Sequence, residues 1–296
     1  MVLFSFMVNL SCYNSEGFKP KANSPPVITS VKILPDKPYI QAELSAVVQC
    51  QDPDNDPVTN QYQWVKNGEE IVGENSYTLK NGNFKKGDLV EVRVTPSDGK
   101  LNGTPFLSTP VKVLNSPPSI QEVWIEPNVA YANDKLKVSV KSSDADGDTV
   151  DYTYQWEKNG EILSQDKNEV LERGQFKKGD SIIVTVTPDD RESIGKPKKS
   201  EPIKIANSPP IITSSPPNKT DGNIYTYQVT VNDPDDNPII FTLKTAPKGM
   251  EIDKETGLIR WEIRRGDQGT PSIEIEASDS EGAKSFQKYT LSIQVR

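Results

Sequence analysis

The residues with the clearest chemistry are aspartates at alternate positions of a short acidic stretch that occurs three times. The copies read Asp52-Pro53-Asp54-Asn55-Asp56, Asp144-Ala145-Asp146-Gly147-Asp148 and Asp233-Pro234-Asp235-Asp236-Asn237. Carboxylates spaced in this way can fold around one hard cation, and calcium tolerates the irregular geometry of such a loop. The spacing therefore predicts calcium sites. The same residue types also build ordinary tight turns through Asx hydrogen bonds, and on the sequence alone this alternative stays open.

The composition excludes several other kinds of site. The 296 residues include no histidine and two cysteines, Cys12 and Cys50, so the chain lacks the commonest general base and cannot build a zinc site or a disulfide framework. A net charge of −8 argues against binding to nucleic acid and against unaided binding to anionic lipid. Paired carboxylates could serve a glycosidase, but nothing in the sequence indicates a cleft between them. We therefore expect no enzyme.

The first residues indicate export. Residues 1–10 are almost wholly apolar, and Ser11, Cys12 and a polar stretch follow. This resembles a bacterial lipoprotein signal peptide, which implies that Cys12 is lipidated. No basic residue precedes the apolar run, and Asn9 stands where a leucine is usual, so an ordinary secretory signal is the alternative. We expect residues 1–22 to be a signal and tether, and a lipid anchor at Cys12 to be the membrane attachment of a cell-envelope protein.

A repeated tetrapeptide divides the rest of the chain. Asn-Ser-Pro-Pro begins at Asn23, Asn115 and Asn207, at intervals of 92 residues (115 − 23 and 207 − 115). This predicts three domains, called here repeat 1 (23–114), repeat 2 (115–206) and repeat 3 (207–296). Because paired prolines restrict the backbone, each Asn-Ser-Pro-Pro linker should be a short, semi-rigid spacer.

Within repeats 1 and 2 the apolar residues alternate with polar ones, as at Val90, Val92 and Val94. A period of two places the apolar side chains on one face of a strand. Asn67-Gly68 and Asn159-Gly160 separate such runs and predict two-residue hairpin turns, since both central positions of that turn need positive φ. About seven strands in each repeat of roughly 90 residues predict an all-β chain of sandwiches.

The order of motifs in repeats 1 and 2 resembles strands B, C and F of an immunoglobulin-like domain. Cys50 and Ser142 hold the strand B position, Trp64 and Trp156 each follow 14 residues later, and alternating valines come next. A disulfide partner on strand F is absent. The two repeats are similar to the tandem Ig-like or PKD-like repeats of bacterial surface proteins.

Repeat 3 carries more specific motifs along its whole length. They are Tyr225-Thr226-Tyr227-Gln228-Val229, Asn232-Asp233-Pro234-Asp235, Ala246-Pro247-Lys248-Gly249-Met250, Thr256-Gly257-Leu258-Ile259-Arg260-Trp261 and Ala277-Ser278-Asp279-Ser280-Glu281-Gly282. In this order they resemble the putative-Ig, dystroglycan-type cadherin-like domain family. Together the resemblances imply a rod of three Ig/cadherin-like sandwiches, with calcium stiffening the joints as in cadherins.

The resemblance also implies which residues would hold the metal. In an Ig-like sandwich the B–C and F–G loops lie at one end, and strand A begins there, so each linker should reach the acidic loop of the repeat that it opens. The F–G turns add further carboxylates. The predicted structural calcium ligands are Asp52, Asp54, Asp56 and Asp98 in repeat 1; Asn115, Asp144, Asp146, Asp148 and Asp190 at the start of repeat 2; and Asn207, Asp233, Asp235 and Asp279 at the start of repeat 3.

Outside these loops, one tryptophan and two lysine pairs need an interpretation. Trp124 lies between Val123 and Ile125, so alternation points it outward, where it could contact a glycan or a protein; packing on the neighbouring linker is the alternative. We expect Lys85-Lys86 and Lys177-Lys178 to be solvated. The sequence as a whole predicts an exported stalk or adhesion module that binds a surface protein or a polysaccharide, with a glycan-binding accessory protein as the alternative function.

Overall fold

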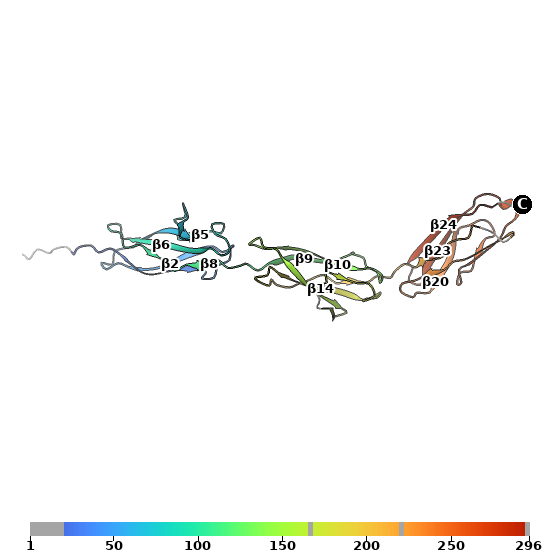
Figure 1. The fold of residues 1–296 in the computed structure, drawn as a ribbon, viewed down its shortest axis with the longest axis horizontal. Coiled ribbons are helices and arrows are strands. Elements are labelled where there is room, and N and C mark those ends of the chain that lie inside the picture. Colours follow the sequence, from blue (N-terminus) through green and yellow to red (C-terminus); the bar gives the residue numbers. More distant parts are fainter. Residues whose placement is uncertain (1–20, 165–167, 219–221, 294–296) are drawn as a thin grey trace, which may run out of the picture. The chain divides into compact units, whose positions relative to one another are not determined.

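The computed structural model describes residues 21–164, 168–218 and 222–293 (Figure 1). The predicted lipidation residue Cys12 and most of the signal segment lie outside these residues. The described chain consists of β-strands and one short 3-10 turn, η1 (Arg265–Asp267), and contains no α-helix, so the all-β prediction is confirmed. It divides into two compact units, Met1–Ser116 and Pro117–Arg296.

Repeat 1 forms two antiparallel sheets. The first has the order β1 (Val27–Leu34), β2 (Leu44–Gln51), β5 (Thr78–Leu79). The second has the order β4 (Glu69–Glu70), β3 (Thr59–Lys66), β6 (Leu89–Ser97), β7 (Phe106–Leu107), and β8 (Val111–Lys112) also pairs with β6. The sandwich therefore has three plus five strands, close to the expected number of about seven, and four of the strands are only two residues long.

The core of repeat 1 follows from the alternation in its strands. Along β6 the valines at 90, 92 and 94 are fully buried, and they pack with Leu44, Trp64 and Leu79. The indole N–H of Trp64 donates to the Ser76 carbonyl oxygen at 2.9 Å, so the polar end of this buried side chain is satisfied. Cys50 at the strand B position is a free thiol on the edge of this core.

Repeat 2 has the same pairing order as repeat 1. One sheet contains β13 (Val170–Leu171), β10 (Leu136–Ser143) and β9 (Ser119–Glu126). The other contains β12 (Glu161–Ser164), β11 (Asp151–Lys158), β14 (Ser181–Asp189) and β15 (Lys198–Lys199), with β16 (Ile203–Lys204) also on β14. Trp156, Ile182, Val184 and Val186 fill the core at positions that match those of repeat 1. The duplicated sequence therefore gives a duplicated fold.

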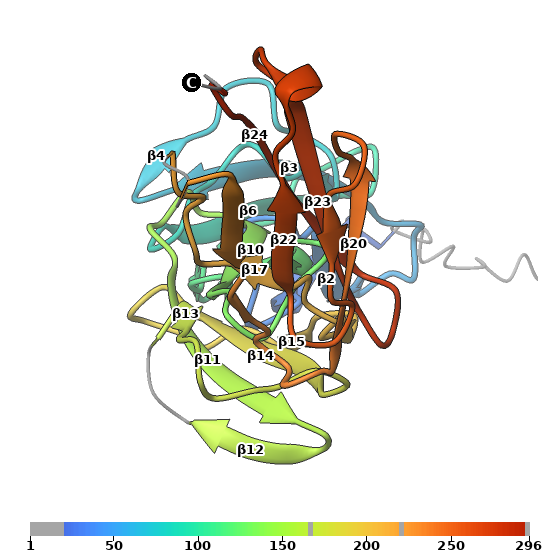
Figure 2. The ribbon, with the colours of Figure 1, turned by 90° about the vertical axis from the view of Figure 1, so that its right-hand side faces the viewer.

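Repeat 3 is built differently. Its sheets are β17 (Ile211–Ile212) with β19 (Val231–Asn232); β18 (Ile224–Gln228), β22 (Leu258–Glu262) and β21 (Glu251–Ile252); and β20 (Ile239–Thr245), β23 (Ser272–Asp279) and β24 (Lys284–Thr290). Figures 1 and 2 show β20, β23 and β24 side by side. The core contains Tyr225, Ile259, Trp261 and Ile273, all of them fully buried.

Local backbone geometry confirms the predicted hairpin turns. Asn67 and Gly68 have φ of 51° and 85°, and Asn159 and Gly160 have 54° and 87°. Both central residues of each turn thus have positive φ, as a turn between β3 and β4, or between β11 and β12, requires.

Each Asn-Ser-Pro-Pro linker of repeats 1 and 2 lies tightly against its own repeat. A Cβ added to Gly103 would lie 2.0 Å from the Pro26 carbonyl oxygen, and a Cβ at Gly195 would lie 2.0 Å from that of Pro118. Only a residue without a side chain fits at these two positions. The glycines therefore fix where the end of the linker can lie.

Candidate cation sites in the acidic loops

All three acidic loops share one backbone conformation. In each, Oδ1 of the first aspartate accepts two backbone N–H groups, from the residues two and four positions later. The distances are 2.7 and 3.1 Å at Asp52, 2.8 and 3.1 Å at Asp144, and 2.9 and 3.1 Å at Asp233. The fourth residue has positive φ in each copy, with values of 63° at Asn55, 83° at Gly147 and 58° at Asp236. The turn chemistry expected of Asp, Asn and Gly is therefore present.

The second oxygen of the same aspartate is not used by this turn. Oδ2 of Asp52, of Asp144 and of Asp233 is buried in each copy and has no hydrogen-bond partner. The whole Asp52 residue is only 8% exposed. A buried carboxylate oxygen without a donor costs free energy unless a cation or a donor satisfies it. Turn formation explains one oxygen of each first aspartate and leaves the other unexplained.

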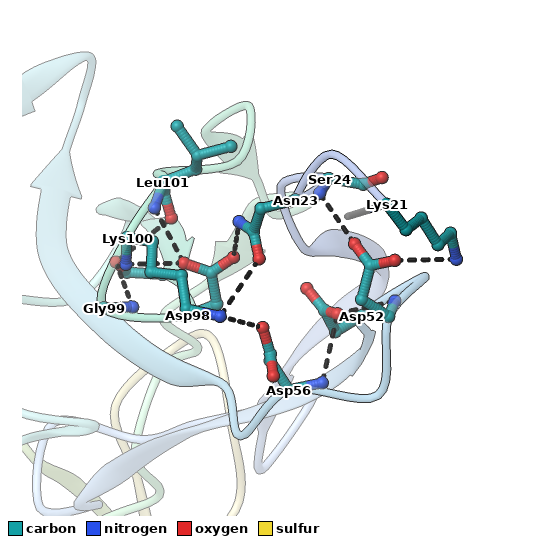
Figure 3. Close-up of polar contacts among 11 residues, drawn as sticks. Lys21, Asn23, Ser24, Asp52, Asp56, Asp98, Gly99, Lys100 and Leu101 are labelled. Carbon is teal, nitrogen blue, oxygen red and sulfur yellow. Dashed lines mark hydrogen bonds and ion pairs between the residues drawn. The ribbon is translucent and has the colours of Figure 1, made fainter. Parts of the chain in front are cut away.

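The linker reaches the acidic end of repeat 1. The Asn23 side-chain amide donates to Asp98 Oδ2 at 2.7 Å, and the Ser24 N–H donates to Asp54 Oδ2 at 2.7 Å. Figure 3 shows Asn23 pointing at Asp98, which Lys100 and Leu101 approach from the same turn. Hydrogen bonds from the Leu101 amide, the Asn23 side chain and the Lys100 amide hold the pKa of Asp98 below its usual value.

Repeat 3 reproduces these contacts although its strands differ. The Asn207 side-chain amide donates to Asp279 Oδ2 at 2.6 Å, and the Ser208 N–H donates to Asp235 Oδ2 at 2.6 Å. Burial pushes the pKa of Asp279 upward, but hydrogen bonds from Asn207 and from the Ala283 and Glu281 amides outweigh it, so the net shift is downward. The structure thus brings together Asn207, Asp235 and Asp279.

The acidic loop of repeat 2 gathers its carboxylates most closely. One oxygen each from Asp144, Asp146 and Asp148 lies within 4.8 Å of the others, and in the described part of the chain no other trio of acidic side chains meets this description. Asp190 in the following turn accepts the amides of Glu192 and Ser193 at 2.8 and 2.6 Å. The fifth predicted ligand, Asn115, lies in the unit Met1–Ser116, whereas these aspartates lie in the unit Pro117–Arg296.

In repeat 1, ammonium groups already lie on the acidic loop. Lys21 pairs with Asp54 Oδ1 at 2.7 Å, and Lys100 pairs with Asp56 Oδ2 at 2.7 Å. Both lysine side chains are well exposed. The hydrogen bond from Lys21, followed by that from the Ser24 amide, holds the pKa of Asp54 below its usual value. The loop therefore attracts cationic groups from two directions.

One lysine of each predicted solvated pair makes a specific contact that sequence reasoning missed. Lys178 Nζ donates to Asn207 Oδ1 at 3.1 Å, Asn237 Oδ1 at 2.9 Å and Glu281 Oε1 at 2.6 Å. Lys86 Nζ donates to Asn115 Oδ1 at 3.0 Å. The expectation of solvated lysines is wrong for these two. The spacing to the linker asparagine could not have singled them out, because Lys85 and Lys177 keep an equally constant interval of 30 residues (115 − 85 and 207 − 177).

Trp124 lies on β9 with 38% of its surface exposed. Its indole N–H donates to Glu126 Oε1 at 2.9 Å, and Ser139 of β10 lies opposite it. This hydrogen bond restrains the ring on a sheet face that is open to solvent. Among all the residues that the structure describes, no helix is long and apolar enough to cross a membrane.

Comparison with known proteins gives the following similarities. Sidekick-1 immunoglobulin domains 1–5 match at 15% identity over 94% of this chain and 60% of that one, with a TM-score of 0.35. The titin I-band fragment I67–I69 matches at 15% identity over 93% and 100%, with a TM-score of 0.32. Drosophila N-cadherin EC1–4 matches at 12% identity over 92% and 76%, with a TM-score of 0.27.

The chain thus spans 60% of the length of the Sidekick-1 structure that it matches. A search of curated protein sequences finds no significant match. A family model, in contrast, covers most of repeat 3, and it agrees with the family resemblance of its motifs. The chain is an all-β protein of β-sandwich repeats, and its residues 209–294 match the family model described as "Putative Ig domain".

Proposed function

We propose that the chain is a non-enzymatic, exported stalk or adhesion module of the cell envelope whose acidic loops bind calcium at the domain joints. The observation that carries the calcium part is the buried, unpartnered Oδ2 of Asp52, Asp144 and Asp233. The same unpartnered oxygen occurs in all three loops, although the strand order of repeat 3 differs from that of repeats 1 and 2. A divalent cation beside this oxygen would supply the missing partner in every copy.

The donor chemistry fits a hard cation. The side chains that could act as ligands at each loop are carboxylates and amides, which offer oxygen atoms, and calcium prefers oxygen ligands and accepts irregular arrangements of them. In repeat 3 the set would be Asp233, Asp235 and Asp279 with Asn207 from the linker. When bound, the ion would cancel carboxylate repulsion. The chain's own contribution is to place the linker amide and the loop carboxylates together, because the Asn207 and Ser208 hydrogen bonds hold the linker on the loop.

Calcium binding at these loops would restrict how the linker moves against the repeat that it opens. The linker is attached to two loops of that repeat through one side chain and one amide. A cation that joins the same loops adds a third attachment and raises the free energy of separating them. The protein would then hold its terminal domains away from the surface to which it is tethered.

Isothermal calorimetry of the full chain with Ca²⁺, together with melting in chelator and in about 1 mM calcium, tests this function. We expect heat of binding and a higher melting temperature with calcium. Asp146→Asn should weaken binding at the loop of repeat 2. Asp36→Asn, which removes the same charge from an exposed residue outside the loops, is the control. Identical melting curves with and without calcium would overturn the calcium proposal.

Export and anchoring rest on the sequence of residues 1–12. We expect the protein to be found in the envelope fraction, and a clickable fatty acid to label it in cells. Cys12→Ser should abolish the label and release the protein, whereas Cys50→Ser, which removes the other thiol, should change neither. Labelling that persists in Cys12→Ser would contradict the anchor, and export without any label would favour the ordinary secretory signal.

A glycan-binding function is the second candidate, and the fixed, exposed ring of Trp124 favours it. An aromatic face held in place by Glu126 can stack on a sugar at little entropic cost. On a polysaccharide array, Trp124→Ala should lose any signal of the wild type, and Val129→Ala, another exposed apolar residue of repeat 2, should retain it.

A further inference from the structure

The side chain of Lys178 extends from the turn before β14 into the oxygens at the start of repeat 3. Its three acceptors come from three separate segments, namely the linker (Asn207), the acidic loop (Asn237) and the turn after β23 (Glu281). An ammonium group has three donors. All three are therefore used, and the side chain is only 26% exposed.

This arrangement is unfavourable for a lysine unless the acceptors hold it. Fixing a lysine side chain costs conformational entropy, and covering its ammonium removes hydration. The turn that carries Lys178 is itself fixed, because Gly179 N–H donates to the Ile205 carbonyl and Ile205 N–H donates to the Asp180 carbonyl, both at 2.9 Å. The turn that carries Lys178 is therefore fixed to Ile205, which lies two residues before Asn207.

The lysine at the equivalent position of repeat 1 makes the first of these three contacts, the one to the linker asparagine. Lys86 Nζ donates to Asn115 Oδ1 at 3.0 Å. The turn that carries Lys86 is fixed as in repeat 2, because Gly87 N–H donates to the Val113 carbonyl and Val113 N–H donates to the Asp88 carbonyl. Two copies with identical spacing, 29 residues from lysine to linker asparagine, indicate a feature of the repeat and not an incidental surface contact.

The ammonium of Lys178 occupies a region of strong negative potential. The Glu281 carboxylate, with Asp235 and Asp233 nearby, holds the pKa of Lys178 above its usual value, so the group is charged at neutral pH. Of its acceptors, Asn207 belongs to the linker and Asn237 to the acidic loop whose first residue, Asp233, carries the orphaned Oδ2. A divalent cation there would lie close to this fixed positive charge.

We propose that Lys178 is a built-in cationic clamp, which ties repeat 2 to the linker and loops of repeat 3 in the metal-free protein and opposes divalent-cation binding at that joint. The clamp stands on the observed contacts alone. The opposition to metal rests on the calcium function proposed above. Because coupling between two ligands is reciprocal, a bound cation would in turn weaken the clamp.

The clamp can be tested in EDTA by measuring distances on the full chain with electron–electron double resonance. Cys12 and Cys50 are replaced by serine, and nitroxide labels are attached at positions 196 and 255, which are exposed residues of repeats 2 and 3. We expect a narrow distance distribution for the parent and a clearly broader one for Lys178→Met. Lys177→Met removes the same charge from the exposed neighbour and should leave the distribution narrow. Equal widths for the two variants, with unchanged circular dichroism, would overturn the clamp.

The opposition to metal is tested by a Ca²⁺ titration that follows the Asn237 amide by NMR. Removing one positive charge beside the site should tighten binding roughly three- to tenfold in Lys178→Met and much less in Lys177→Met. Calcium binding with equal affinity in both variants would overturn the opposition. No binding in any protein would instead contradict the proposed function, and the resonance result in EDTA would still decide the clamp.

Discussion

The acidic loops of repeats 1 and 3 have the same backbone turn and the same linker contacts, yet their charges are balanced from different places. In repeat 1 the ammonium groups come from Lys21, which lies two residues before the linker, and from Lys100, in a turn of the same repeat, and both side chains are exposed. In repeat 3 the ammonium comes from Lys178 of the preceding repeat and is largely covered. A local lysine can only neutralise a loop. A lysine from the neighbouring repeat also joins two domains.

Because the ammonium groups of the two loops differ in exposure, the loops should respond differently to substitution of their lysines. Exposed ion pairs contribute little to stability because solvent and salt screen them. A partly covered ammonium with three oxygen acceptors is screened less, and its loss leaves acceptors without a donor. We therefore expect variants of the shared turn to affect both repeats alike, and variants of the lysines to separate them.

The largest effect is expected where the linker is held against its repeat. In Gly103→Ala the new Cβ would lie 2.0 Å from the Pro26 carbonyl oxygen, so the linker must move away from the loop that it contacts. We expect a loss of about 1–3 kcal/mol in the free energy of unfolding of repeat 1, measured by urea denaturation. Gly266→Ala, where a Cβ meets nothing within 4 Å, is the control. A neutral Gly103→Ala would show that the linker can lie elsewhere.

Substitutions of the first aspartate of each loop can show whether the shared turn needs a metal. Asp52→Ala removes the acceptor of two backbone amides and should cost about 1–3 kcal/mol in chelator. Asp52→Asn keeps an acceptor oxygen and replaces the orphaned one, so it should be near neutral in chelator but lose the stabilisation by calcium. Asp233→Asn should behave in the same way in repeat 3. Calcium stabilisation that survives in both asparagine variants would remove the basis for the metal sites.

Acid should weaken the linker contact of repeat 3 in a defined direction. The folded pKa of Asp279 is depressed, so its contribution is fully present above the unfolded pKa of about 3.9 and is lost as the pH falls through the lower folded value. The difference in unfolding free energy between wild type and Asp279→Asn should therefore shrink as the pH is lowered from about 6 to about 2. The experiment is a series of urea titrations, with Asp36→Asn as the reference. A difference independent of pH would contradict this assignment.

The smallest effect is expected at the two lysines that pair with the acidic loop of repeat 1. Lys21→Gln and Lys100→Gln should barely change the melting temperature in chelator, since both side chains are exposed. Both should still tighten calcium binding at that loop, because each removes a positive charge from it. Differential scanning calorimetry and the calcium titration measure the two effects. A large drop in melting temperature would remove the contrast with Lys178.

Much of the fold could be predicted because it depends on local patterns. The alternation at Val90, Val92 and Val94 fixes one buried face of β6, and Asn67-Gly68 fixes the hairpin that follows β3. The two amide contacts of Asp52 span only two and four residues, so they belong to the local sequence as well. The two-residue strands such as β7 could not be located from local patterns, because they form only when a longer strand offers a free edge.

The partners of the loops depend on tertiary structure. Asp98 meets Asn23 across 75 residues, and Lys178 meets Glu281 across 103, distances along the chain at which no local pattern specifies a contact. Nor does the sequence distinguish Lys178 from Lys177, since both precede the same Gly-Asp turn.

The sequence by itself determined the repeats, the strands and the acidic turns, because these arise from side-chain periodicity and from hydrogen bonds within a few residues. Only the packed sandwiches decided which oxygen of each first aspartate is left without a partner and which lysine reaches the linker. The burial of a carboxylate oxygen and the distance from a lysine to the linker depend on the assembled sheets, which bring together residues that are far apart in a repeat.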